Sequence, residues 1–155
     1  MSAAGGGAAP GSGRGHGRVA ALDLGARRIG VAFSDSGRTI ASPWGTIERS
    51  GDPARDRSAV VHAVEEVEAS TLVVGLPLSL SGEVGPAATA ALEEVAELRA
   101  LLDPLGVSVE TVDERFTTVE AQRSLRAAGR TGKAARKVID SAAAMVLLQA
   151  WLDHG

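Results

Sequence analysis

Four carboxylates stand out in this sequence because apolar residues surround them. Asp23 lies inside the run VAALDL, Asp113 and Glu114 follow the run VSVETV, and Asp140 directly precedes SAAAMVLLQAW. Burying an uncompensated carboxylate costs several kcal/mol by order of magnitude, so Asp23 is expected either to be exposed at a sheet edge or to pair with a cation. Carboxylate oxygens suit Mg²⁺ or Mn²⁺, and two such ions can activate a water and stabilise the leaving oxygen of a phosphodiester. These acids therefore predict metal-dependent phosphodiester hydrolysis.

The composition excludes several other catalytic chemistries. The chain has no cysteine, which removes thiolate nucleophiles, thiolate zinc sites and disulfides. Its three histidines, at positions 16, 62 and 154, are too scattered for a metal motif or a Ser/His/Asp triad. Any chemistry must therefore use the carboxylates.

The pattern of apolar residues predicts one α/β domain with a five-stranded mixed sheet flanked by helices. The residues GARR predict a tight hairpin between the first two strands, and Pro43 and Gly45 predict a bulge or an edge position in the third. The expected strands are 18–24, 29–34, 39–48, 71–78 and 107–114. The expected helices are 51–70 with Asp52 as its cap, 86–102, 118–128 and 134–153.

This arrangement brings the acids toward one another. Glu114 comes at the carboxyl end of the fifth strand, where ligands gather in open α/β sheets. On a helix, Asp140 shares a face with Ala144, Leu147, Leu148 and Trp151, so it is expected to point toward the sheet. A capping role for Asp140 is the alternative interpretation.

Four segments together resemble one known family. ALDLGARRIGVAFSD, VVGLPLSLSGEVGP, VDERFTTVEA and KVIDSAAAMVLLQAWLD resemble, in order and spacing, the YqgF family of bacterial nucleases, also called RuvX. The resemblance covers about residues 18–153 and implies an RNase H-like fold. It also implies maturation of the 5′ end of pre-16S rRNA, with Holliday junction resolution as the alternative activity. The implied catalytic and metal-binding acids are Asp23, Glu114 and Asp140, with Asp113 as a helper.

A basic segment precedes Asp140 and carries no acidic residue. Such a segment can neutralise several phosphates, so we expect it to bind structured RNA or a four-way DNA junction. Aromatic residues make up only 3% of the chain, so recognition should rely on backbone and shape more than on base stacking. The basic residues are Arg123, Arg126, Arg130, Lys133, Arg136 and Lys137.

Two other function classes use similar features. Actin-like sugar and acetate kinases share the strand, DLG and hairpin pattern, but they need two such lobes, whereas 155 residues supply one. A nucleic-acid-binding module that kept the RNase H-like fold without catalysis is the second alternative. The presence of all three acids favours the enzyme over this module.

The remaining expectations concern domain organisation and location. Residues 1–17 include seven glycines and predict a flexible tail ahead of a nuclease domain at 18–155. No apolar run approaches the roughly 20 residues that span a bilayer, so no membrane partner is expected. The lack of cysteine suits a reducing compartment, and a cytoplasmic location is expected. Assembly as a homodimer is left open.

Overall fold

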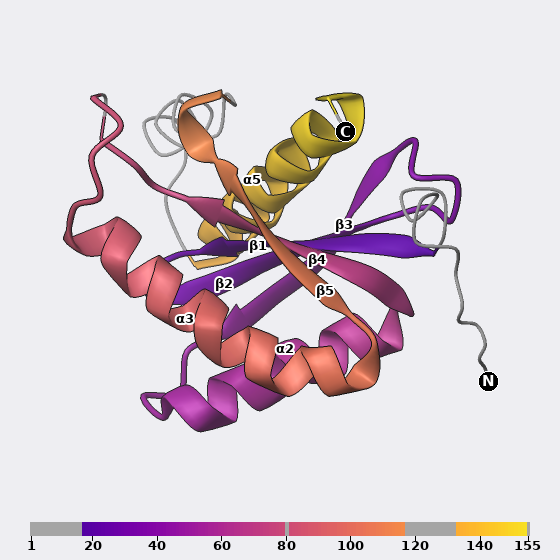
Figure 1. Ribbon diagram of the computed structural model, residues 1–155, viewed down its shortest axis with the longest axis horizontal. Coiled ribbons are helices and arrows are strands. Elements are labelled where there is room, and N and C mark those ends of the chain that lie inside the picture. Colours follow the sequence, from indigo (N-terminus) through magenta and orange to yellow (C-terminus); the bar gives the residue numbers. More distant parts are fainter. Residues whose placement is uncertain (1–16, 80, 117–132, 155) are drawn as a thin grey trace.

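A computed structural model describes the backbone of residues 17–79, 81–116 and 133–154, with the side chains of all of these except 116 and 133–140. Its centre is the predicted five-stranded sheet (Figure 1), and its strands lie in the order β3-β2-β1-β4-β5. The strands are β1 (Arg18–Leu24), β2 (Arg28–Ser34), β3 (Ala41–Glu48), β4 (Ala69–Leu76) and β5 (Ser108–Asp113).

The sheet is mixed, with an antiparallel half and a parallel half. β1 pairs antiparallel with β2, and β2 with β3, whereas β4 pairs parallel with both β1 and β5. Gly25 closes the first hairpin, because its N–H donates to the carbonyl of Arg28 at 3.0 Å and a Cβ there would lie 2.6 Å from the same oxygen. The predicted bulge is confirmed: the register of β2 against edge strand β3 shifts between Val31 and Ala32.

Helices cover both faces of the sheet. α2 (Pro53–Glu66) and α3 (Pro86–Leu102) pack on one face, and α5 (Lys133–His154) packs on the other (Figure 1). The bounds of α3 match the predicted 86–102, and α5 matches the predicted final helix within one residue at each end. The predicted helix 118–128 lies outside the described residues, as do residues 1–16 of the predicted tail. None of the described helices is long and apolar enough to cross a membrane.

Strand alternation divides the core into two layers. Ala20 and Leu22 of β1 pack with α2 and α3, whereas Val19 and Ala21 pack with Ala144 and Leu148 of α5. Side chains along a strand alternate between the two faces, so position 23 belongs to the face that α5 covers. The fold thus places the aspartate of β1 on the same face as the last helix.

A buried carboxylate fixes the connection between β3 and α2. Asp56, in the first turn of α2, accepts hydrogen bonds from the backbone N–H of Ser50 at 3.0 Å and from its hydroxyl at 2.7 Å. These hydrogen bonds favour the ionised form and lower the pKa of Asp56. The turn that follows β3 is therefore held by a charged acceptor.

The Asp56→Asn variant should melt at a lower temperature than the parent at pH 7. A carboxyl whose pKa is lower in the folded state stabilises the fold above its unfolded value of 3.8 and loses this contribution as the pH falls further. The difference in melting temperature should therefore shrink below that pH. Thermal melts of both proteins from pH 3 to 7 measure it. Asp52→Asn is the control, since asparagine caps a helix as well as aspartate does. A difference in melting temperature between the parent and Asp56→Asn that does not change with pH would contradict the prediction.

Candidate active site

A cleft of about 560 Å³ opens at the carboxyl ends of β1 and β4. Asp23 and Glu114 both line it, and so do Arg49, Gly75 and Glu94. Small alanine side chains from the first turns of α3 form one wall. The fold therefore brings together two of the three acids that the sequence predicts to be catalytic.

Asp23 is almost completely buried near the end of β1. Asp23 is 2% exposed, and it lies opposite Gly30 of β2 in the sheet register. The strand forms because the flanking residues are aliphatic, and the hairpin turn at Gly25 follows two positions later. An ionised group at this depth requires compensating charge. That Asp23 binds a cation stays a prediction.

Glu114 reaches the same cleft from the far side of β4. It begins a short 3₁₀ helix (Glu114–Phe116) directly after β5 and is 8% exposed. Its Oε2 atom lies over Gly75, where a Cβ would approach it to 2.8 Å. The same Cβ would lie 2.7 Å from Cδ1 of Leu147 in α5. The absence of a side chain at position 75 therefore lets the carboxylate and the helix approach β4.

Asp113, the predicted helper, is held by a neighbouring arginine. Arg115 donates to it from the backbone N–H at 2.9 Å and from Nη2 at 2.6 Å. The hydrogen bonds from Arg115 lower the pKa of Asp113. The guanidinium of Arg115 also lies beside Gly82 in the segment that follows β4. These contacts order the chain around Glu114, and a direct part for Asp113 in catalysis stays a prediction.

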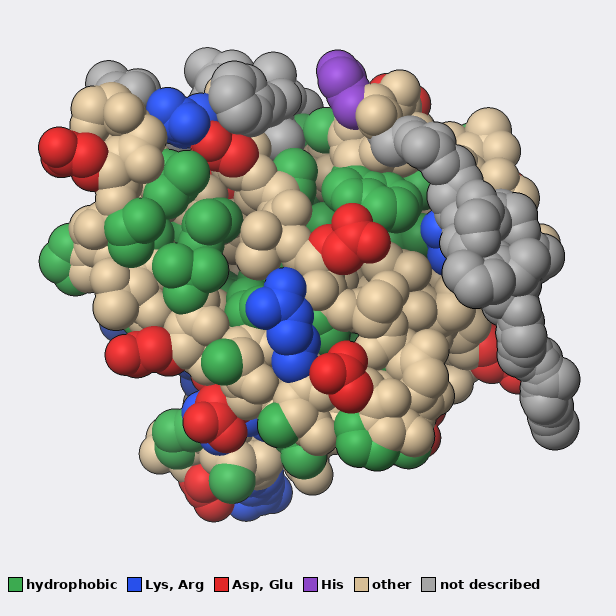
Figure 2. Space-filling model, in the orientation of Figure 1, with side chains coloured by type: hydrophobic (Ala, Val, Ile, Leu, Met, Phe, Trp, Pro, Cys, Tyr) green, Lys and Arg blue, Asp and Glu red, His purple; other side chains and the backbone are tan. Residues whose placement is uncertain are grey.

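The other predicted site residues lie outside the described side chains. Position 140 is in the backbone of α5, two helical turns before Leu147, but nothing of the Asp140 side chain is described. Arg123, Arg126 and Arg130 fall in the undescribed segment, and the side chains of Lys133, Arg136 and Lys137 are also not described. On the face shown in Figure 2, the described Lys and Arg side chains lie among acidic ones and form no continuous basic patch.

Two residues of the cleft were missed by the sequence analysis. Gly75 carries a signal that could have found it, because a glycine inside a buried strand often marks a close approach of another group. Arg49 carries none, since an arginine after an edge strand is ordinary surface composition. Its place in the cleft depends on how β3 ends against the first hairpin.

The donor set of the cleft fits a hard divalent cation. Asp23 and Glu114 supply carboxylate oxygens, and neither a thiolate nor an imidazole lines the cleft within the described residues. The side chains that the structure describes include no group of three His, Cys, Asp or Glu residues that could hold a metal. Asp140, whose side chain is not among them, is the predicted third ligand.

Comparison with known sequences gives consistent relatives. The RuvX family model, described as Holliday junction resolvase, matches residues 17–154. A protein of Mycobacterium ulcerans named "Putative pre-16S rRNA nuclease" is 46% identical over 147 residues, which cover 94% of this chain and 82% of the relative. A protein of Rhodococcus opacus with the same name is 45% identical over 143 residues, which cover 90% and 79%.

Solved structures share the fold at low sequence identity. RuvC of Thermus thermophilus, solved in complex with a Holliday junction substrate, has a TM-score of 0.54 and 15% identity over 90% of this chain and 96% of that one. The yeast mitochondrial Holliday junction resolvase Ydc2 has a TM-score of 0.53 and 12% identity, and the match covers 88% of this chain and 78% of that one. The fold is of the RNase H-like class, and the family model and the named relatives indicate a nuclease. Within that class, the chain belongs to the RuvX family.

The Gly75→Ala variant should lose cleavage activity by about tenfold or more, because the new methyl group would displace the Glu114 carboxylate, a predicted metal ligand. Mn²⁺ affinity, measured by titration calorimetry, should fall with it. Contact with Leu147 should also destabilise the fold by about 1–3 kcal/mol.

The matched control for this variant is Gly85→Ala. Nothing lies within 4 Å of a Cβ at position 85, so this variant should keep parental activity and Mn²⁺ affinity. If Gly75→Ala also keeps both, the close approach does not position Glu114.

Proposed function

We propose that this nuclease cleaves the precursor of 16S rRNA at its 5′ end. The observation that carries the proposal is the meeting of two buried carboxylates, Asp23 and Glu114, in one open cleft of a chain about 45% identical to relatives bearing the name pre-16S rRNA nuclease. A ribosomal RNA substrate implies action in the cytoplasm.

The residues that act on the bond are Asp23, Glu114 and Asp140. RuvC-like and RuvX-like nucleases generally use divalent metal ions, and we propose Mg²⁺ or Mn²⁺ here, held by these three carboxylates. When bound, such ions supply Lewis-acid activation of a water and stabilisation of the leaving oxygen. Asp23 and Glu114 are fixed by a strand and by the start of a 3₁₀ helix, so little side-chain freedom remains to be lost when substrate binds.

Resolution of four-way DNA junctions is the second candidate function. The family description and the structural likeness to RuvC favour it, and an RNase H-like fold with an acidic site suits either nucleic acid. Cleavage of a labelled pre-16S 5′ leader and of a labelled four-way junction under the same conditions separates the two. The proposal fails if the junction is cut and the leader is not.

Cleavage should require Mg²⁺ or Mn²⁺ and stop in Ca²⁺ or in excess EDTA. Ca²⁺ is larger and more loosely coordinated, so it orients the attacking water poorly. Gel assays of leader cleavage across the three ions measure this requirement. Full activity in EDTA would refute the assignment of the carboxylates to a metal site.

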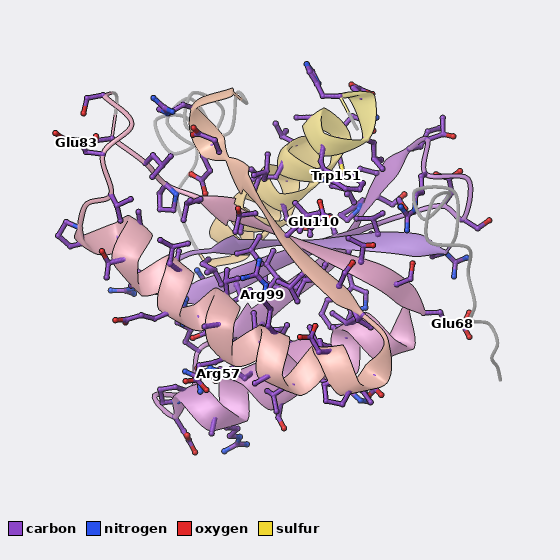
Figure 3. The ribbon with its side chains drawn as sticks, viewed as in Figure 1. Arg57, Glu68, Glu83, Arg99, Glu110 and Trp151 are labelled. Carbon is purple, nitrogen blue, oxygen red and sulfur yellow. The ribbon has the colours of Figure 1, made fainter. Side chains whose placement is uncertain are left out.

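The Glu114→Gln variant should bind the leader like the parent but cleave it at a rate lower by at least about 100-fold, because it removes a charged ligand that acts on the reacting atoms. Glu110→Gln is the matched control, since Glu110 is an exposed residue four positions earlier in β5 (Figure 3). Single-turnover cleavage and filter binding measure both effects. Tight binding without cleavage by the parent itself would favour the non-catalytic module.

We also propose that the basic segment contacts phosphates. Replacing Arg130, Lys133 and Lys137 with alanine should weaken binding to every RNA sequence and lower the slope of log K against log salt by about two to three units. Cleavage at saturating RNA should remain. Parental affinity and slope in the triple variant would show that the substrate enters by another surface. Arg123, Arg126 and Arg136 are expected to contribute in the same way.

A further inference from the structure

We propose that Arg49 binds a backbone phosphate of the substrate beside the scissile bond. This inference rests on the proposed nuclease function and names a contact that lies at the acidic cleft itself. Arg49 lines the same cleft as Asp23 and Glu114. The expected ligand group is a phosphodiester oxyanion of the RNA.

The position of Arg49 is tied to the hairpin turn that follows the proposed catalytic aspartate in β1. Its Nε donates to the carbonyl of Gly25 at 2.7 Å, and Gly25 follows Asp23 by two residues. The backbone N–H of Arg49 also donates to the carbonyl of Arg27 at 3.0 Å. The guanidinium is therefore anchored to the first hairpin, at a place fixed relative to Asp23.

The turn beyond Arg49 is also rigid. Ser50 is held by the buried carboxylate of Asp56 through two hydrogen bonds. Arg49 itself is exposed, yet the residues on both sides of it are fixed by a strand and by these bonds. A preorganised cation loses less conformational entropy when an anion binds.

The guanidinium of Arg49 keeps unused donors. Arginine has five N–H donors, and within the described residues only Nε of the Arg49 side chain donates a hydrogen bond. No described carboxylate lies within salt-bridge distance of it, although, in addition to the hydrogen bonds from Ser50, its charge acts on Asp56 from farther away and lowers the pKa of that carboxyl. Other arginines near the site are neutralised: Arg57 pairs with Glu94 at 2.8 Å, and Arg115 pairs with Asp113 at 2.6 Å. Figure 3 shows Arg57 between α2 and α3.

The chemistry of these free donors points to phosphate. The planar guanidinium matches phosphate oxygens with two parallel hydrogen bonds, which a lysine cannot reproduce. A cation on the rim also offsets the repulsion between a polyanionic backbone and the carboxylates of the cleft. The competing interpretation is that Arg49 only closes the hairpin through Gly25.

Binding of the labelled pre-16S leader to the full chain tests the proposal, with Asp23→Asn in every protein so that the RNA stays intact. Adding Arg49→Gln keeps an N–H donor in the side chain but removes the charge. Affinity should fall by about tenfold, and the slope of log K against log salt should fall by about one unit. Arg49→Lys should retain the slope and lose part of the affinity.

Arg55→Gln is the matched control. Arg55 is an exposed arginine in the first turn of α2 that does not line the cleft, so its removal should leave affinity and slope nearly unchanged. If Arg49→Gln behaves like Arg55→Gln, the proposal is overturned. A loss of affinity with an unchanged slope and a lower melting temperature also overturns it, in favour of hairpin closure. If the protein that carries only Asp23→Asn fails to bind the leader, the proposed function is refuted together with this contact.

Discussion

The close approach of Glu114 to Gly75 is the constraint on which the site depends. A carboxylate from the end of β5 can reach the end of β1 only by crossing β4, and the side chain of any other residue at position 75 would occupy that path. Leu147 packs into the same space from α5. Because position 75 has no Cβ, the residue that follows edge strand β5 and a leucine of α5 can both approach central strand β4 at the same point.

Charge balance around the cleft follows from this packing. Burial of Asp23 and Glu114 places negative charge where solvent screens it poorly. The nearby pairs Arg57–Glu94 and Arg115–Asp113 each cancel within themselves, so they order the walls and add little net charge. These two pairs therefore leave the positive charge of Arg49, which also lines the cleft, outside any salt bridge among the described residues.

Local sequence signals predicted most of the fold. GARR predicted the hairpin, Pro43 and Gly45 predicted the bulge of β3, and the pattern of 86–102 predicted the bounds of α3. Such signals depend on residues that are neighbours in the chain, so they can be interpreted without knowledge of the tertiary structure. The burial of Asp23 was predictable for the same reason, because its flanking residues are aliphatic.

The details of the site could be predicted less well from the sequence, because they depend on contacts between segments that are far apart in the chain. Which arginines lack a carboxylate partner is decided by pairs such as Arg57 and Glu94, which are 37 residues apart. The role of Gly75 depends on Glu114 and Leu147, which come from two other elements. The resemblance supplied the acids residue by residue, but nothing in it pointed to Arg49.

The packing of Leu147 against Gly75 also bears on synthesis of the protein. β1 leaves the ribosome more than 100 residues before α5, so the face of the sheet that carries Asp23 stays uncovered during most of translation. Contacts between segments so far apart form late, because a long loop must close first. A nascent chain therefore carries Asp23 without the helix that covers its face of the sheet, and this layer of the core forms only when α5 has emerged and docked.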